Sequence, residues 1–130
     1  MDPIANMLTK IKNAQAVSHQ TVDIPFSKIN FNLAKLLEEE KLIESVETQG
    51  RKVRKVIRIK LKYKDYDNPV MTNLKKISKL GRRVYVNKND LKDLVAQKGS
   101  SVISTSQGLM TAKEALKKGL GGEYICDIVF

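Results

Sequence analysis

The sequence predicts an α+β fold made of two small lobes. Three observations support this prediction: apolar residues recur at helical spacing near the start, later runs alternate between apolar and polar residues, and a polar, turn-forming stretch divides the chain near its middle. We therefore expect an N-terminal lobe over residues 1–64, a linker at 65–69 ("DYDNP") and a mainly β C-terminal lobe with short helices over 70–130.

The N-terminal lobe is predicted to contain a helix, a strand, a second helix and two further strands. Asp2 and Pro3 are typical of a helix N-cap and first helical position, and the apolar residues that follow them recur at helical spacing. A short strand, "TVDIPF", should come next, and Ser27 is placed to cap the second helix. The segment "TQGR" separates two strand-like runs, which predicts a hairpin.

The second run of that hairpin is strongly basic. Its odd positions are mostly apolar and its even ones are mostly lysines or arginines, so we expect a strand with one dry face and one basic face. The apolar positions are Val53, Ile57, Ile59, Leu61 and Tyr63. The basic face is either a solvated surface that discourages aggregation or a surface for a polyanion.

The C-terminal lobe is predicted to be mainly strands. "VMTNLKKI" and "RRVYV" should form a hairpin around "SKLG", followed by a short helix in "NDLKDLVAQKG" and a strand in "SSVIS". Thr111 and Glu114 have the spacing of a capping box, which predicts a helix up to Lys118. The last strand holds the one cysteine, Cys126, for which we expect a buried structural thiol and a reducing, cytoplasmic setting.

The composition points to a soluble protein that binds a polyanion. Twenty-four lysines and arginines against 14 acidic residues give a formal net charge of +10, and no apolar run is long enough to span a membrane. The N-terminus also lacks the continuous apolar core of a signal peptide. We expect neither a membrane association nor a small-molecule substrate.

The stretch "STSQG" (Ser104 to Gly108) is the first candidate functional site. Its hydroxyls could be nucleophiles or could bind an anion at the start of the helix that follows. Catalysis requires a base, and the only histidine, His19, lies in the other lobe, so we expect no enzyme. One histidine and one cysteine give no ligand spacing, so we expect no metal and no cofactor. A Ser/Thr turn also often satisfies only its own backbone, which leaves anion binding open.

The stretch "GLGGE" (residues 119–123) is the second candidate. Gly119 alone would suffice to end the helix, so Gly121 and Gly122 serve either a ligand-facing turn or a tight connection to the last strand. Glu123 is unfavourable beside a phosphate, but a carboxylate can accept hydrogen bonds from base amino groups.

Four blocks of the chain together resemble a known family. They are "DPIANMLTKIKNA" (2–14), "IPFSKI" (24–29), "LKKISKLGRRVYV" (74–86) and "STSQGLMTAKEALKKGLGGE" (104–123), and in this order they resemble the bacterial form of the small-subunit ribosomal protein family S-eight. The chain departs from the family pattern at Leu80, Ala112 and Leu116, where the family usually has Pro, Asp and Arg. The last two departures should weaken polar or RNA contacts around that helix, and the first should alter a turn.

The resemblance implies a two-domain protein of the cytoplasmic ribosome. It would bind the central domain of small-subunit ribosomal RNA, contact neighbouring ribosomal proteins, promote subunit assembly and repress translation of its own operon messenger RNA. Carried to this chain, it implies that Ser104, Thr105 and Ser106, in the loop ending at Gly108, contact bases and sugar-phosphate, with Tyr85, Gly122 and Glu123 at the border of that surface. We assign Lys10, Lys12, Lys28 and Lys55 to phosphate contacts, because long lysines position a protein on RNA without reading it.

Two other functions remain as alternatives. A basic adaptor module would dock an acidic protein partner without preference for structured RNA. A serine-dependent hydrolase would react with a serine-directed activity probe.

Overall fold

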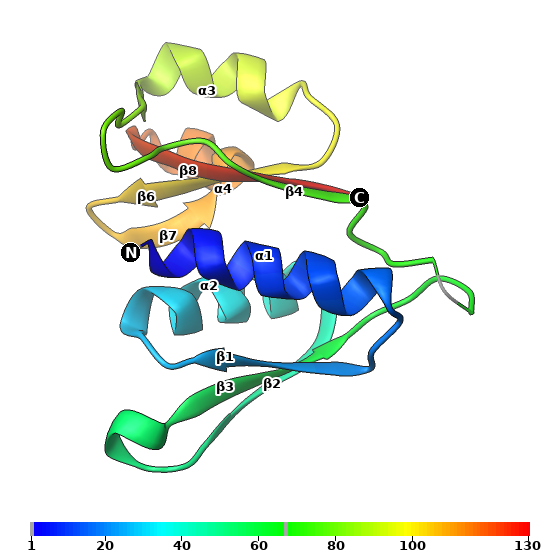
Figure 1. Ribbon diagram of the computed structural model, residues 1–130. Coiled ribbons are helices and arrows are strands. Elements are labelled where there is room, and N and C mark those ends of the chain that lie inside the picture. Colours follow the sequence, from blue (N-terminus) through cyan, green and yellow to red (C-terminus); the bar gives the residue numbers. More distant parts are fainter. Residues whose placement is uncertain (1, 67) are drawn as a thin grey trace. The chain divides into compact units, whose positions relative to one another are not determined.

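The structure, a computed structural model, describes residues 2–66 and 68–130 and divides into an N-terminal unit, residues 1–70, and a C-terminal unit, residues 71–130. Each unit has its own antiparallel sheet and its own helices (Figure 1). The predicted α+β class is confirmed. Two backbone hydrogen bonds cross the segment predicted as a linker. The Lys64 amide donates to the Asn68 carbonyl at 2.7 Å, and the Val70 amide donates to the Lys62 carbonyl at 3.1 Å. Asp67, in the same segment, lies outside the described residues.

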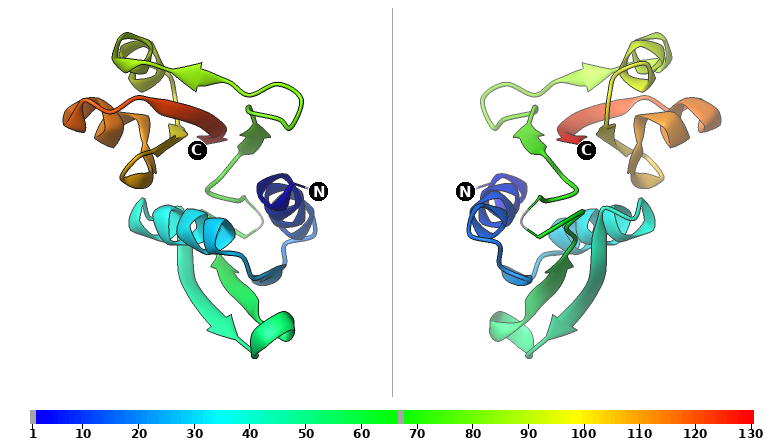
Figure 2. Two further views of the ribbon diagram at one scale, coloured as in Figure 1. Left: turned by 90° about the vertical axis from the view of Figure 1, so that its left-hand side faces the viewer. Right: turned by 90° about the vertical axis from the view of Figure 1, so that its right-hand side faces the viewer.

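The N-terminal unit is a three-stranded sheet with both helices on one face, as Figure 2 shows. β3 is the central strand, with β1 and β2 antiparallel on either side. The helix caps predicted at Asp2 and Ser27 are confirmed, since each side chain accepts backbone amide hydrogens of its helix. The elements are α1 (Pro3–Ala16), β1 (Thr21–Pro25), α2 (Lys28–Glu39), β2 (Ile43–Gln49), the short 3-10 helix η1 (Lys52–Arg54) and β3 (Val56–Leu61).

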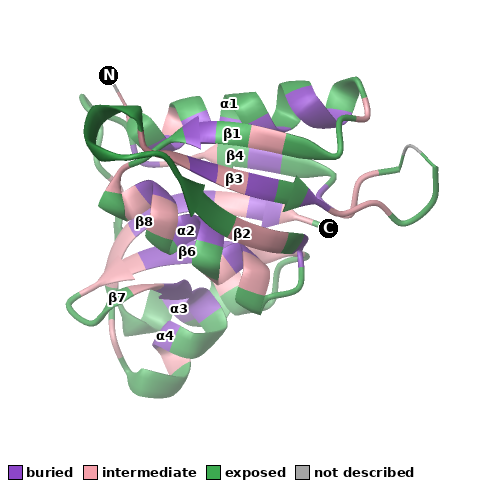
Figure 3. Cartoon of the chain, turned by 90° about the horizontal axis from the view of Figure 1, so that it is seen from below, coloured by how far each residue is buried: buried purple, intermediate pink, exposed green. Residues whose placement is uncertain are grey.

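The alternation predicted for the basic run holds only within β3. Ile57, Ile59 and Leu61 are buried and alternate with more exposed basic residues, so the dry face packs toward the helices. Val53 was predicted on that dry face, and this is wrong: it is 99% exposed in the η1 loop, whose exposure is visible in Figure 3. The alternation breaks because the chain turns at Gly50 and Lys52, both with positive φ, before β3 begins.

The basic face of β3 is partly neutralised by its neighbouring strands. Asp23 on β1 and Glu47 on β2 lie opposite Arg58 in the sheet register. The Arg58 guanidinium donates to both carboxylate oxygens of Asp23, at 2.9 and 3.1 Å. This hydrogen bond is the main cause that lowers the pKa of Asp23. The repulsion between like charges along β3 is therefore reduced by acidic residues of the protein itself.

The C-terminal unit is built around its last strand. β8 pairs with β4 and β5 along one edge and with β6 along the other, and β7 completes the sheet beside β6. The elements are β4 (Asn73–Lys76), β5 (Tyr85–Val86), α3 (Lys88–Val95), β6 (Ser100–Thr105), β7 (Gly108–Thr111), α4 (Ala112–Lys118) and β8 (Gly122–Val129). Cys126 is buried in β8 as predicted, and burial raises the pKa of its thiol to about 12.

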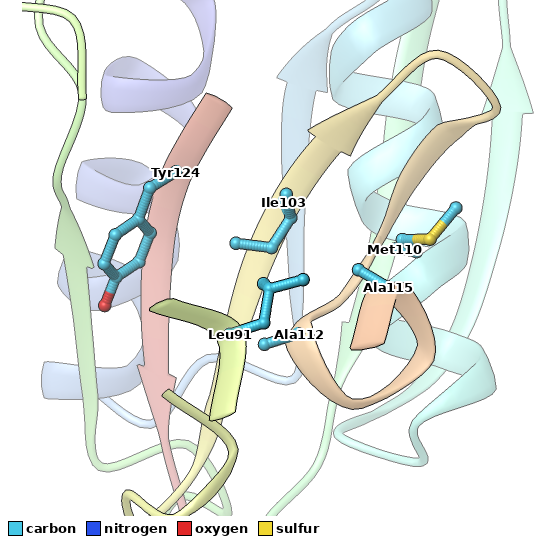
Figure 4. Packing of buried hydrophobic residues seen from close by; sticks show 6 residues of the cluster. All are labelled: Leu91, Ile103, Met110, Ala112, Ala115 and Tyr124. Atoms are coloured by element: carbon cyan, nitrogen blue, oxygen red, sulfur yellow. The ribbon is translucent and has the colours of Figure 1, made fainter. Parts of the chain in front are cut away.

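The core of the C-terminal unit lies between this sheet and its two helices. Leu91 from α3 and Ala115 from α4 meet Ile103, Met110 and Tyr124 from three strands, as Figure 4 shows. Burying a leucine, isoleucine or methionine side chain contributes roughly 1.5–3 kcal/mol relative to leaving it in water. The core fixes which sheet face is covered, and therefore which side chains point away from it.

The hairpin predicted over residues 70–86 is not formed. β4 and β5 do not pair with each other; both pair with β8, at Cys126 to Val129 and at Gly122 to Glu123 respectively. Between them the chain makes a tight turn, closed by hydrogen bonds between Lys79 and Arg82. The local pattern of two strand-like runs around a glycine was right about the strands but wrong about their partner.

Candidate nucleic-acid interface

The hydroxyl stretch forms the tip of a β-hairpin. β6 and β7 pair antiparallel, with Ser104 opposite Leu109 and Thr105 opposite Gly108, so the turn is Ser106 and Gln107. Gly108 has a φ of +106°, which L side chains rarely adopt, and this explains glycine at the end of the turn. The expectation that the stretch leads directly into a helix is wrong, because β7 separates it from the α4 cap at Thr111.

A row of side chains crosses four strands beside this hairpin. Tyr85 on β5 lies opposite Glu123 on β8, and Glu123 lies opposite Ser104 on β6, whose partner on β7 is Leu109. Residues directly opposite in a sheet share one face. The next row along holds the buried Tyr124, Ile103 and Met110.

Successive side chains on a strand alternate between faces, so the row with Ser104 points away from the core of Figure 4. Tyr85 is 69% exposed. The structure thus brings together Tyr85, Ser104 and Glu123, which are far apart in the sequence.

The three hydroxyls of the hairpin have different surroundings. The Thr105 hydroxyl donates to the Gly108 carbonyl at 2.9 Å and accepts from the Gln107 amide at 3.1 Å, so it closes the turn. Within the described part of the chain, the hydroxyls of Ser104 and Ser106 make no hydrogen bond; Ser104 is half-buried and Ser106 exposed. The two serines are therefore the hydroxyls that remain available to a ligand.

Glu123 is held by the chain between β4 and β5. Its Oε2 accepts a hydrogen bond from the Ser78 hydroxyl at 2.6 Å and another from the Arg83 guanidinium at 3.0 Å. Burial alone would raise the pKa of this carboxyl, but these hydrogen bonds and the charges of Arg83 and Lys76 outweigh it and hold the pKa below its usual value. One oxygen of the predicted base acceptor is thus already used within the protein.

Sequence reasoning missed Ser78 and Arg83 as partners of Glu123. Ser78 is fully buried, and its hydroxyl also accepts the Val84 amide hydrogen at 3.0 Å, so it ties the turn to β8. The available signal was a serine inside "KISKLGRRV" and an acid at the start of the last strand, but nothing local links residues 45 positions apart.

The glycines before β8 allow backbones to approach closely. A Cβ on Gly121 would lie 2.6 Å from the Val86 carbonyl oxygen, and one on Gly122 would overlap the Ser104 carbonyl oxygen. Of the two readings left open by the sequence, the tight connection accounts for both residues. Gly119, with a φ of +69°, ends α4 as predicted.

The three departures from the family pattern lie in different surroundings. Ala112 is buried in the core at the start of α4, and Leu116, four residues further along the helix, is partly buried against the same core. An apolar side chain at 116 thus adds packing where the family has a charge. Leu80 is exposed at the tip of the turn between Lys79 and Arg82.

The four lysines assigned to phosphates all lie in the N-terminal unit. Lys10 and Lys12 are exposed on α1, and Lys28 is exposed at the first position of α2. Lys55 is half-buried just before β3, with its Nζ 4.2 Å from the centroid of the Phe26 ring. Within residues 2–66 and 68–130, no helix combines the length and the apolar character needed to cross a membrane.

Comparison with known proteins identifies the family. A model described as "Ribosomal protein S8" matches residues 2–129. The chain is 46% identical over 127 residues to the small ribosomal subunit protein uS8 of Thermodesulfovibrio yellowstonii, which covers 98% of this chain and 97% of that relative. The uS8 proteins of Syntrophomonas wolfei (46% over 127 residues; 98% and 96%) and Clostridioides difficile (46% over 125 residues; 96% and 95%) are similarly close.

These matches confirm the resemblance carried by the four sequence blocks. The family model spans nearly the whole chain, and the relatives align over almost their full length. The chain therefore belongs to the ribosomal protein S8 family of the small ribosomal subunit.

Proposed function

We propose that the chain binds the central domain of small-subunit ribosomal RNA through the β6–β7 hairpin and helps the subunit to assemble. The observation that carries this proposal is the hairpin itself, in which the hydroxyls of Ser104 and Ser106 make no hydrogen bond within the described residues. Ser104 lies in one row with Glu123 and Tyr85 on the sheet face that points away from the core, and Ser106 lies exposed in the turn. Its residues are also those that the family resemblance marks. Ribosomal RNA and neighbouring ribosomal proteins are the partners expected for a small-subunit protein.

RNA structure explains why short hydroxyls suit this task. An RNA duplex hides its bases in a deep, narrow major groove, so a protein reads the wide minor groove or distorted sites through 2′-hydroxyls and exposed base edges. A serine hydroxyl can both donate and accept at such an edge. The proposal therefore assigns recognition to Ser104 and Ser106, while Thr105 keeps the turn in shape and Gly108 allows it.

The lysines of the N-terminal unit are proposed to hold phosphates. Lys10, Lys12 and Lys28 are exposed on helices, where a flexible ammonium reaches the RNA backbone without reading sequence. Lys55 is less free because it lies over the Phe26 ring. Membership of a family of structural ribosomal proteins supports a role without catalysis and gives no support to the acidic-partner adaptor.

The test separates recognition from phosphate contact. Ser106→Ala should weaken binding to a central-domain RNA fragment by about 1–3 kcal/mol at fixed salt, because it removes a hydrogen bond to a partner that stays buried. Ser100→Ala, at the end of β6 far from the turn, is the matched control and should bind normally. Both variants should keep the stability of the parent chain.

Lysine variants should respond differently to salt. Lys12→Gln should flatten the logarithmic dependence of affinity on salt by roughly 0.7–0.9 if it loses one phosphate contact, whereas Ser106→Ala should leave the slope unchanged. Filter binding or fluorescence anisotropy over a series of salt concentrations measures both. Identical behaviour of the two variants would show that the assignment of roles is wrong.

The resemblance also supports self-repression through the operon messenger RNA. If that RNA mimics the ribosomal site, the same hairpin must read both. Ser106→Ala should then weaken binding to a leader fragment of the operon by the same factor as for the ribosomal fragment.

A further inference from the structure

A small hollow lies on the N-terminal unit, whereas the residues assigned to recognition belong to the C-terminal unit. It is formed where α1 begins, where β1 ends and where α2 starts. Its walls are mainly apolar, with Pro3, Ile24, Pro25 and Phe26 contributing carbon surface and Ser27 and Asn30 contributing polar atoms. A concave apolar site with few polar groups is the usual form of a ligand pocket.

Asn30, one of the residues that line this hollow, has an unused acceptor. The residue is only 3% exposed, and its Nδ2 donates to the Pro25 carbonyl at 3.4 Å. That carbonyl accepts only, which fixes the amide with nitrogen toward Pro25 and Oδ1 on the other side. Oδ1 is buried and has no hydrogen-bond partner among the described residues. A buried acceptor without a partner is costly, so a ligand carrying an N–H donor would be favoured here.

Phe26 supplies an aromatic surface beside that acceptor. The residue is 38% exposed, its ring centroid lies 6.0 Å from that of Phe31, and Nζ of Lys55 lies over the ring, 4.2 Å from its centroid. An exposed ring accompanied by a cation is the combination on which unstacked bases of single-stranded nucleic acid bind. The cation also favours the phosphate attached to such a base.

The start of α2 adds a further feature that favours an anion. Ser27 caps the helix by accepting the Asn30 amide hydrogen at 3.2 Å, and the helix runs for twelve residues. The positive end of its dipole lies at the rim of the hollow, next to the exposed Lys28. One kind of ligand, a nucleotide, suits all four features: the hollow, the unused Asn30 acceptor, the Phe26 ring and the Lys55 ammonium.

We infer that this hollow binds a single unstacked nucleobase of RNA, stacked on Phe26 and donating from an amino group to Asn30 Oδ1. Adenine and cytosine carry such an amino group on the edge that they present when unpaired. The inference rests on the proposed RNA-binding function, to which it adds a second, base-specific contact in the N-terminal unit. The N-terminal unit would then contact a base in addition to holding phosphates through its lysines.

Short oligonucleotides test this contact without the hairpin's RNA. We would titrate the full chain with a single-stranded hexa-adenylate and follow backbone and Asn30 side-chain amide signals by NMR. The expected result is shifts centred on Phe26, Ser27 and Asn30. An abasic ribose-phosphate chain of the same length should bind at least fivefold more weakly. Equal binding of the two chains would overturn the inference, because it would mean that only the backbone is held.

Modified bases and variants test the two halves of the contact. N6,N6-dimethyladenine lacks the amino donor, so its oligomer should bind severalfold more weakly than hexa-adenylate if Asn30 accepts from that group. Phe26→Leu keeps an apolar wall but removes the ring, and it should lower the affinity for hexa-adenylate about fivefold or more. Phe31→Leu, at the neighbouring ring outside the hollow, is the matched control and should bind like the parent chain.

The outcomes separate this inference from the proposed function. If the ribosomal fragment binds and responds to Ser106→Ala while hexa-adenylate causes no shifts at the hollow, only the inference is wrong. If hexa-adenylate binds at the hollow and the ribosomal fragment does not bind, the proposed function fails and the base site stands. Equal affinity of the methylated and unmethylated oligomers would mean that water or a peptide group satisfies Oδ1, which would also overturn the inference.

Discussion

At the scale of single residues, neighbouring hydroxyls in one hairpin have different roles. Thr105 uses its donor and an acceptor position inside the turn, while Ser104 and Ser106 keep theirs. A variant of Thr105 would therefore change the shape of the turn as well as the surface. Variants of the two serines change the surface alone, which makes them the cleaner probes of binding.

Glu123 leads to a prediction about pH. Its pKa is lowered in the folded chain, so its contribution to stability is complete above the pKa of an unfolded glutamate, about 4.3, and is lost as the pH falls through the lower folded value. Glu123→Gln should lower the free energy of unfolding at pH 7 by about 1–3 kcal/mol, because Ser78 and Arg83 lose a charged acceptor. Urea unfolding at several pH values measures this.

The control for this prediction is a carboxylate of the same charge elsewhere in the unit. Glu114 is about half exposed and its Oε1 lies 3.7 Å from the Lys118 ammonium, so Glu114→Gln should change stability by less than about 1 kcal/mol. The loss in Glu123→Gln should shrink as the acid limit is approached. A loss of equal size in both variants, or one that does not vary with pH, would contradict the account of Glu123.

Residue roles that depend on neighbouring sequence could be predicted, and those that depend on distant partners could not. The caps at Asp2 and Ser27 and the left-handed Gly119 follow from conformational preferences within one helical turn. The partners of Glu123 follow from a strand pairing that joins residues 40 or more positions apart. The same limit applies to Asn30, whose unused acceptor depends on how α2 meets the end of β1.

At the scale of elements, adding a single methyl group at Gly122, the first residue of β8, should strongly destabilise the sheet. Gly122→Ala would place a methyl group against the Ser104 carbonyl oxygen, and because that atom belongs to a backbone the strands must shift. We expect the free energy of unfolding to fall by about 1–3 kcal/mol, the usual range for overpacking. Thermal or urea unfolding measures it, and binding by the hairpin should weaken with it.

Gly81 offers the matched control. No atom lies within 4 Å of a Cβ placed there, so Gly81→Ala should leave stability unchanged or raise it by up to about 1 kcal/mol through the unfolded chain. If both alanines were tolerated equally, the close approach of β6 and β8 would not be the reason for glycine at 122.

The elements of the C-terminal unit show where sequence patterns stop being informative. The runs that became β4 and β5 were recognised, yet their predicted pairing was wrong because both pair with β8, whose residues lie 36 to 56 positions further along the chain. β7 was missed because it is only four residues long and begins with the glycine that ends the turn. In the N-terminal unit, by contrast, β2 and β3 are close in sequence, and their pairing was predicted correctly.

At the scale of the whole molecule, the chain has two separate sheets in two compact units. We therefore expect a substitution that destabilises one unit to leave the stability of the other unchanged. Native-state hydrogen exchange of Gly122→Ala should speed up at the amides of β6 and β8, while the amides of β3 should keep their protection. Exchange followed by NMR measures both units in one sample. Equal acceleration throughout the chain would mean that the two units unfold together.

The ion pair between Asp23 and Arg58 has a consequence for how strongly the chain would attract the RNA that we propose it binds. A count of the 24 lysines and arginines includes Arg58 in full, yet its Nε and one terminal nitrogen already donate to the Asp23 carboxylate on β1. An RNA strand passing over this sheet would gain little from it, and few condensed cations would be released there. The number of counterions released when the complex forms should accordingly be smaller than a count of arginines and lysines suggests.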